Sequence, residues 1–112
     1  MRLVLDTSAI IYLVEKRVDP AALMEFELFV PTAVLEELQV LSRRSKKARV
    51  ALELLRFLKY RVYDAPGPAD FAALRAAKEL GAALLTGDNK LAEAARRGGV
   101  PVARFHKKQV VL

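Results

Sequence analysis

The chain has 112 residues, 54% of them hydrophobic, which is enough apolar sequence for one buried core, so we expect a single domain over residues 1–112. It contains no cysteine, which excludes a disulfide framework and a thiolate metal site and leaves oxygen atoms or the single histidine, His106, as ligands for any metal. The net charge of +6 favours polyanionic partners such as nucleic acid.

The amino-terminal apolar run is short. Only Leu3, Val4 and Leu5 precede the acidic residue Asp6, too few for the core of a signal peptide. No stretch reaches the roughly 18 apolar residues that a membrane span needs. We therefore expect a cytoplasmic protein that does not associate with membranes.

Short apolar runs alternate with segments of helical periodicity in the first half of the chain. Residues 2–6 predict a strand that ends in an acid, and residues 8–16 have apolar side chains at helical spacing. Residues 26–30 predict a second strand. Pro31 is tolerated in a first helical turn and leads into a predicted helix over residues 32–41.

The next predicted helix, over residues 48–60, is apolar on more than a narrow stripe. Leu52, Leu55 and Leu58 recur at helical spacing, and Leu54 and Phe57 widen the face. Such a face exceeds what one core requires. We therefore expect part of it to contact another subunit in a homodimer or a higher homo-oligomer.

The second half of the chain continues the alternation. Residues 61–63 predict a third strand, and residues 70–80 an alanine-rich helix closed by Gly81. A fourth strand is predicted over residues 82–86, a helix over 89–97, a fifth strand over 100–105 and a short edge over 109–112. Repeated strand-helix alternation predicts an α/β fold with a parallel sheet flanked by helices.

Four acidic residues follow four successive predicted strands. Asp6 ends the first strand, and Glu37 lies within the first two turns of the helix after the second. Asp70 opens the helix after the third strand, and Asp88 follows the fourth through Thr86 and Gly87. The carboxyl ends of parallel strands gather at one edge of the sheet, where ligands bind, so the four acids are expected to converge there.

Each acid also has a purely structural interpretation. Asp6, Asp70 and Asp88 stand where an Asp side chain caps a helix, and Glu37 alone is a typical solvated helix charge. The combination of four acids in a basic protein favours chemistry, because like charges held together are costly unless a cation lies among them. Carboxylates without His or Cys suit Mg²⁺ or Mn²⁺ and phosphoryl chemistry.

Four segments resemble the PIN-domain family in order and spacing over nearly the whole chain. They are Leu-Val-Leu-Asp-Thr-Ser-Ala at residues 3–9, Val-Pro-Thr-Ala-Val-Leu-Glu-Glu-Leu at 30–38, Ala-Asp at 69–70, and Leu-Leu-Thr-Gly-Asp at 84–88. The resemblance implies a three-layer fold with a parallel sheet of about five strands in the order 3-2-1-4-5. It also implies an endoribonuclease that cleaves single-stranded RNA with Mg²⁺ or Mn²⁺.

The resemblance implies which residues of this chain correspond to the family's metal-binding and catalytic acids. They are Asp6, Glu37, Asp70 and Asp88, with Glu36 as the alternative to Glu37. In the mechanism that this implies, Asp6 and Asp88 bind the metal directly. Glu37 or Asp70 then positions or deprotonates the attacking water.

The resemblance also implies supporting residues. Thr7 or Ser8, together with Thr86, is expected to hydrogen-bond the first Asp or a water, although a hydroxyl at a helix start is equally a cap. Two departures from the family bear on the metal count. Many members have a further acid where this chain has Asn89, a candidate supporting residue, and related proteins have a second Asp where it has Phe71. Both departures argue against a second metal.

Two basic groups are candidates for contacts with the RNA backbone. The first comprises Arg43, Arg44, Lys46, Lys47 and Arg49, and the second Arg96, Arg97, Arg104, Lys107 and Lys108. The alternative interpretation of both groups is an ordinary solvated loop and tail.

Three alternatives concern function. A phosphohydrolase of the haloacid-dehalogenase type also begins with an apolar strand ending in Asp, but it requires a second Asp two residues later, where this chain has Ser8. A catalytically degenerate PIN module would bind RNA or a protein partner without cleavage. Within the nuclease interpretation, the chain resembles both VapC-type toxins, which are countered by a protein antitoxin, and stand-alone RNA-processing nucleases.

Overall fold

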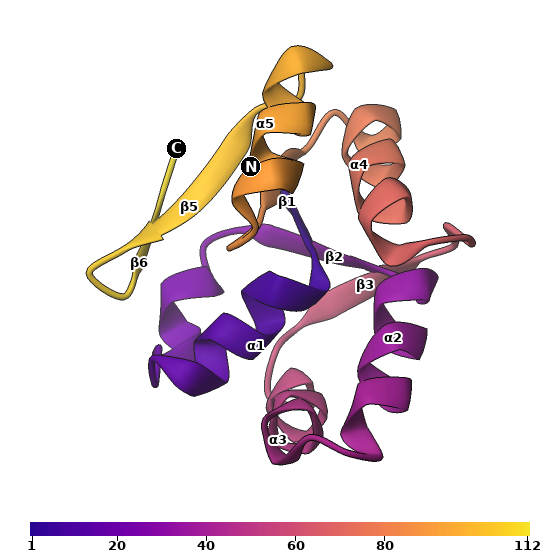
Figure 1. The fold of residues 1–112 in the computed structure, drawn as a ribbon. Helices are drawn as coiled ribbons and strands as arrows, with labels where there is room; N and C mark the ends of the chain where they lie inside the picture. The colour runs from indigo at the N-terminus through magenta and orange to yellow at the C-terminus, as the bar shows by residue number, and fades with distance from the viewer.

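A computed structural model describes all of residues 1–112, which alternate between strands and helices (Figure 1). The strands are β1 (Arg2–Leu5), β2 (Glu27–Pro31), β3 (Tyr60–Tyr63), β4 (Ala83–Leu85), β5 (Val102–His106) and β6 (Gln109–Val111). The helices are α1 (Thr7–Glu15), α2 (Thr32–Ser42), α3 (Lys46–Leu55), α4 (Ala69–Leu80) and α5 (Asn89–Arg97), with a short 3-10 helix η1 (Pro20–Leu23) that the sequence did not predict.

The strands form one sheet with the order β3-β2-β1-β4-β5-β6. The first five strands are parallel and confirm the predicted order 3-2-1-4-5. The sheet has six strands rather than about five, because β6 pairs antiparallel with β5 at the edge. Lys107 and Lys108 connect the two strands with φ angles of 50° and 63°, as the favoured two-residue hairpin turn requires.

The predicted helix over residues 48–60 is wrong at its carboxyl end. Helix α3 ends at Leu55, and Tyr60 already pairs with Leu28 as the first residue of β3. Leu58 is buried in the core between these two elements. The broad apolar face that suggested a subunit contact therefore combines residues of a helix and of the turn after it, and Phe57 in that turn is exposed.

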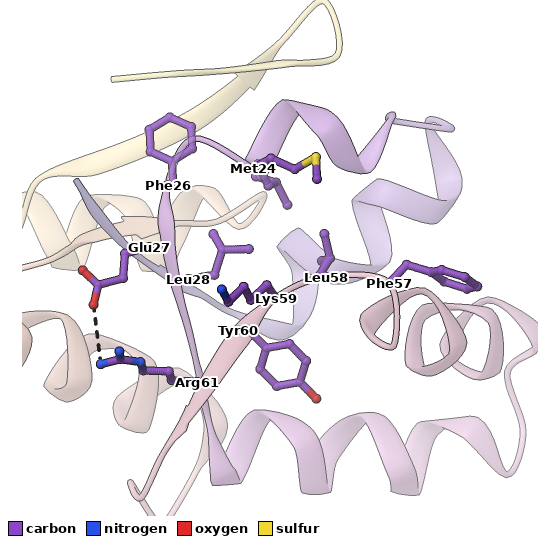
Figure 2. Close-up of a pocket in the computed structure, with 10 residues that line it drawn as sticks. Met24, Phe26, Glu27, Leu28, Phe57, Leu58, Lys59, Tyr60 and Arg61 are labelled. Atoms are coloured by element: carbon purple, nitrogen blue, oxygen red, sulfur yellow. Dashed lines mark ion pairs between the residues drawn. The ribbon is translucent and has the colours of Figure 1, made fainter.

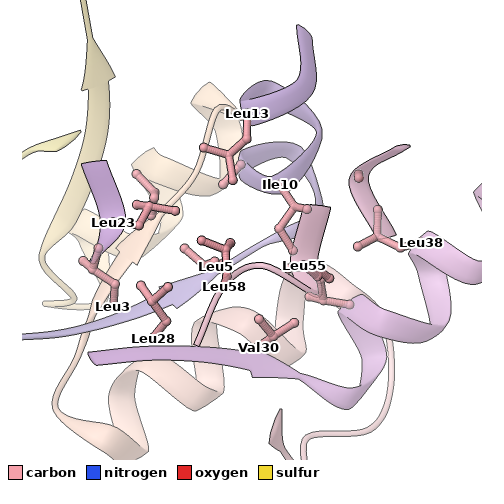
Figure 3. Packing of buried hydrophobic residues seen from close by; sticks show 14 of the residues in the cluster. Leu3, Leu5, Ile10, Leu13, Leu23, Leu28, Val30, Leu38, Leu55 and Leu58 are labelled. Carbon is pink, nitrogen blue, oxygen red and sulfur yellow. The ribbon is translucent and has the colours of Figure 1, made fainter. Parts of the chain in front are cut away.

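Side chains of the central strands alternate between two cores, as the period of two in a strand requires. Leu3 and Leu5 of β1 pack with α1, α2 and α3 on one face of the sheet, as Figure 3 shows for part of this cluster. Val4 points to the other face, where Ala73 of α4 and Leu91 of α5 pack. The molecule is therefore a three-layer α/β/α structure, as the resemblance implied. None of its helices has the length and apolar character to cross a bilayer.

Candidate active site

Three of the four predicted acids line one cavity of about 410 Å³. Glu37 extends from the second turn of α2, Asp70 from the first turn of α4, and Asp88 from the residue before α5. Each of these helices starts just beyond the carboxyl end of a strand, so the crossovers bring the acids to one edge of the sheet. The other lining residues are Pro68, Ala69, Phe71, Leu74, Lys90, Leu91 and Ala94.

Asp6 lies behind this cavity and does not line it. Its side chain is 2% exposed and accepts hydrogen bonds from Ala9 N at 2.7 Å, from Ser8 Oγ at 2.9 Å and from Thr86 Oγ1. Burial raises the pKa of Asp6, and the nearby charge of Asp70 adds to the rise, whereas the hydrogen bonds lower it. These donors occupy most of the roughly four lone-pair positions of a carboxylate, which leaves room for at most one metal bond.

Two hydroxyls connect Asp6 to the loop that carries Asp88. Ser8 Oγ donates to Asp6 and accepts from Gly87 N at 3.0 Å. Thr86 Oγ1 donates to Asp6 and accepts from Asp88 N at 2.9 Å. The buried carboxylate therefore fixes the start of α5 through side chains that use both their donor and acceptor capacity.

Asp88 is a helix cap and still has a free oxygen. Its Oδ1 accepts from Lys90 N at 2.8 Å and Leu91 N at 3.1 Å, whereas its Oδ2 has no hydrogen bond. Asp6 caps α1 in the same way through Ala9 N. The capping interpretation is therefore correct for these two residues, and for Asp88 it leaves one oxygen facing a possible ligand.

Asp70 is not a cap. The residue before α4 is Pro68, with no side-chain cap, and the Asp70 carboxylate makes no hydrogen bond or ion pair. Partial burial raises the pKa of Asp70, and the charges of Asp88 and Glu37 raise it further. The interpretation of Asp70 as a helix cap is therefore wrong. Its carboxylate also has no partner that would offset the repulsion from Asp88 and Glu37.

The tandem acids of α2 are separated by the helix itself. Both side chains are exposed, but only Glu37 lines the cavity, because successive helical residues point about 100° apart. Like Asp70, Glu37 has no ion pair or hydrogen bond through its carboxylate. Glu37 is therefore the member of the pair that faces Asp70 and Asp88.

The donor set fits a hard divalent cation. No three Asp, Glu or His side chains form a ready-made metal cage. Mg²⁺ does not require one, since it typically uses one or two carboxylates and keeps several waters. Asp70 and the free Oδ2 of Asp88 are the groups that would hold the ion, and Glu37 lines the same cavity without a partner.

Two of the predicted supporting residues do not contact the acids. Thr7 Oγ1 is buried and has no hydrogen-bond partner. Asn89 accepts from Arg104 at 2.7 Å and does not line the cavity. Sequence reasoning did not select Lys90, the one basic residue on the cavity wall. Its position two residues after Asp88, at a helix start, was the available signal.

The first basic group spans the turn after α2 and the first turn of α3. Lys47 pairs with Glu15 at 3.8 Å, and Arg49 donates to the carbonyl oxygen of Ser42 at 2.9 Å, so both already have partners. Arg44 lies in the turn that follows α2, which ends at Ser42. The basic residues without such partners are Arg43, Arg44 and Lys46.

The second basic group does not form one patch. Arg97 pairs with Glu93, and Arg104 donates to Asn89. Lys107 and Lys108 lie in the turn between β5 and β6. These residues are therefore distributed over α5 and the far edge of the sheet.

A second cavity, of about 450 Å³, lies at the opposite, amino-terminal ends of β2 and β3 (Figure 2). It is mainly apolar, and Met24 and Phe57 are exposed beside it. Its one acid, Glu27, is paired with Arg61 at 3.7 Å. Because it has no group of free carboxylates, the cavity at the carboxyl edge is the candidate active site.

Comparisons with known proteins agree with this architecture. The family model of the PIN domain matches residues 3–62. No curated protein matches the chain. A structure of the PIN domain endonuclease Utp24 has a TM-score of 0.79 and 17% identity, and the match covers 97% of this chain and 88% of that chain.

Two further structures are similar in fold. A domain of a functionally unknown protein from Methanocaldococcus jannaschii has a TM-score of 0.73 and 20% identity, with 94% of this chain and 91% of that chain covered. VapBC2 from Rickettsia felis, bound to a promoter DNA fragment, has a TM-score of 0.70 and 18% identity, with 95% and 100% covered. At such identities the likeness concerns the fold.

Proposed function

Because the chain belongs to the PIN-domain family, we propose that it is a Mg²⁺- or Mn²⁺-dependent endoribonuclease that hydrolyses phosphodiester bonds of single-stranded RNA. The observation that supports this most is the cavity that three unneutralised carboxylates share at the carboxyl edge of the sheet. A bound divalent cation there would supply Lewis-acid chemistry and a water of lowered pKa.

Each residue of the site has a proposed part. Asp88, through its free Oδ2, and Asp70 would hold the ion, and Asp6 would add negative charge next to them. Glu37 would accept the proton of the attacking water, because its carboxylate has no other partner. Ser8 and Thr86 keep the Asp88 loop in place.

Basic side chains have a separate proposed part. Lys90 binds an oxygen of the phosphate at the cavity. The segment with Arg43, Arg44 and Lys46 binds the phosphate backbone beyond it, and Lys47 and Arg49 add to the local field. Asn89 acts only indirectly, through its bond to Arg104.

The test is cleavage of a labelled single-stranded RNA with Mg²⁺, Mn²⁺ or EDTA. Asp88→Asn keeps the cap but removes the charge. We expect a loss of more than about a hundredfold, above the roughly 10- to 100-fold cost of an outer hydrogen-bond partner. Asp19→Asn is the matched control, because Asp19 also caps a helix but lines another cavity. Activity that survives both EDTA and Asp88→Asn would overturn the proposal.

The degenerate module is the competing proposal. A wild type that binds RNA but cleaves none with either metal would support it. The biological role is proposed to be that of a toxin with a protein antitoxin, for which the likeness to VapBC2 is a reason, or that of a stand-alone RNA-processing nuclease, for which the likeness to the endonuclease Utp24 is a reason. Growth arrest on expression, relieved by a co-expressed partner, separates the two. The proposed homodimer is tested by light scattering.

A further inference from the structure

An exposed phenylalanine lies beside the carboxylates. Phe71 follows Asp70 in the first turn of α4 and lines the same cavity. It is 69% exposed, so its ring contributes little to the core. Leu74, one turn later on the same side of α4, continues the apolar surface into the cavity. The exposed ring of Phe71 is therefore accessible to a ligand that enters the cavity.

The cavity is lined by two kinds of side chain. The apolar ones include Phe71, Leu74 and Leu91, and the charged ones are the three acids and Lys90. A nucleotide is chemically complementary to this lining, because the faces of its base are apolar and its phosphate is anionic. Base stacking on aromatic side chains is tolerant of sequence, since every base has a π-face.

We propose that the cavity binds one unpaired nucleotide next to the scissile bond, with its base stacked on the ring of Phe71. The inference rests on the proposed nuclease function and specifies the side chain that contacts a base of the substrate. A base within a duplex has both faces covered by its neighbours, so it cannot stack on a side chain unless it leaves the helix. Phe71 therefore selects single-stranded RNA over duplex RNA, while Lys90 contacts the phosphate of the same nucleotide.

A comparison within the molecule provides a control. Phe57 is the other exposed phenylalanine, at 78%, and it lies beside the apolar cavity of Figure 2. The two rings are similarly accessible, yet only Phe71 lies with the free carboxylates. Loss of Phe57 should leave RNA binding unchanged.

The experiment pairs a change in the protein with a change in the RNA. Two fluorescent decamers are compared, one of uridylate and one of 5,6-dihydrouridylate, which has the same charge but a non-aromatic base. Binding is measured by anisotropy at low temperature with Ca²⁺ in place of Mg²⁺. Phe71→Ala should weaken binding of the uridylate decamer about tenfold, within the range measured for one stacked base. Phe71→Ala should leave binding of the dihydrouridylate decamer unchanged.

Further variants distinguish stacking from general apolar contact. Phe71→Tyr should restore binding of the uridylate decamer, Phe71→Leu should not, and Phe57→Ala should match wild type. In cleavage assays with Mg²⁺ or Mn²⁺, Phe71→Ala should raise KM about tenfold with kcat unchanged, because stacking contributes equally to ground-state and transition-state binding. The melting temperature should not change, since the ring is exposed.

The outcomes separate this inference from the proposed function. If wild type cleaves RNA and Phe71→Ala behaves like wild type, or weakens both decamers equally, the stacking inference is overturned and the nuclease proposal stands. If stacking depends on Phe71 but no metal supports cleavage, the inference stands and the nuclease proposal fails. A wild type that neither binds nor cleaves RNA overturns both.

Discussion

Replacing Asp70 by Asn should stabilise the metal-free protein at neutral pH. The folded state holds this carboxylate without a partner, and partial burial and the charges of Asp88 and Glu37 raise its pKa. A raised carboxyl pKa means that the folded state binds the proton more tightly than the unfolded state does. The stability contributed by this group is therefore complete below its usual pKa of 3.8 and is lost as the pH rises through the raised value.

The expected size follows from exposure and position. An exposed charge pair is worth about 0.2 to 1 kcal/mol, and Asp70 has two repulsive neighbours. The start of α4 favours an acid in its first turn by about 0.3 to 1 kcal/mol, which opposes the repulsion. Because the pKa is raised on balance, we expect a net gain of about 0.5 kcal/mol for Asp70→Asn. For a domain of this size that is about 2 to 4 °C in Tm.

Bound metal should make wild type more stable than Asp70→Asn. An ion that binds only the folded state stabilises wild type by about 2.7 kcal/mol at a hundred times its Kd, or by on the order of 10 °C. Asp70→Asn removes one of the groups proposed to hold the ion, so its rise in Tm with Mn²⁺ should be much smaller. Wild type should therefore be the less stable protein in EDTA and the more stable one in millimolar Mn²⁺.

Thermal melts of wild type, Asp70→Asn and the control Glu36→Gln provide the measurement. The advantage of Asp70→Asn in EDTA at pH 7.5 should shrink as the pH falls through the raised pKa of Asp70 and in 0.5 M salt, which screens exposed charges. Glu36→Gln should follow wild type, because Glu36 does not line the cavity. If Asp70→Asn is less stable than wild type in EDTA, or responds equally to Mn²⁺, the repulsion argument is wrong.

Three further predictions concern the same site. Glu37→Gln should reduce RNA cleavage far more than Glu36→Gln, and the reverse order would transfer the role to Glu36. Thr86→Val should lower the unfolding free energy by about 1 to 3 kcal/mol in melts, because it removes one hydrogen bond to the buried Asp6 and leaves the Asp88 N–H without its acceptor, whereas Thr86→Ser should cost less. Neutralising the unpaired basic residues Arg43, Arg44 and Lys46 should weaken binding of all RNA sequences similarly. It should also flatten the log-log dependence of RNA affinity on salt concentration by up to about 0.7 per contact. An unchanged slope would mean that the RNA binds elsewhere on the protein.

The sequence by itself determined the elements whose signals are local. The alternation of apolar residues and the helix boundaries at Asp88 and Gly98 predicted α5 at its observed bounds, and Gly81 closes α4 with a φ of 62°. The strand order was available only through the resemblance to a family, since periodicity says nothing about which strands are neighbours. The end of α3 was missed because Leu58 and Tyr60 continue a helical pattern, and only their contacts with the core and with β2 distinguish them.

The tertiary structure decided how the acids differ. The sequence places Asp6, Asp70 and Asp88 alike at strand-helix junctions, yet one is buried under three hydrogen-bond donors, one is unpaired and one is a cap with a free oxygen. The local sequence also could not show that Phe71 and Lys90 line the same cavity, because the two residues belong to different helices. Capping and periodicity depend on residues a few positions apart, whereas burial, repulsion and shared cavities depend on how the crossovers bring distant segments together.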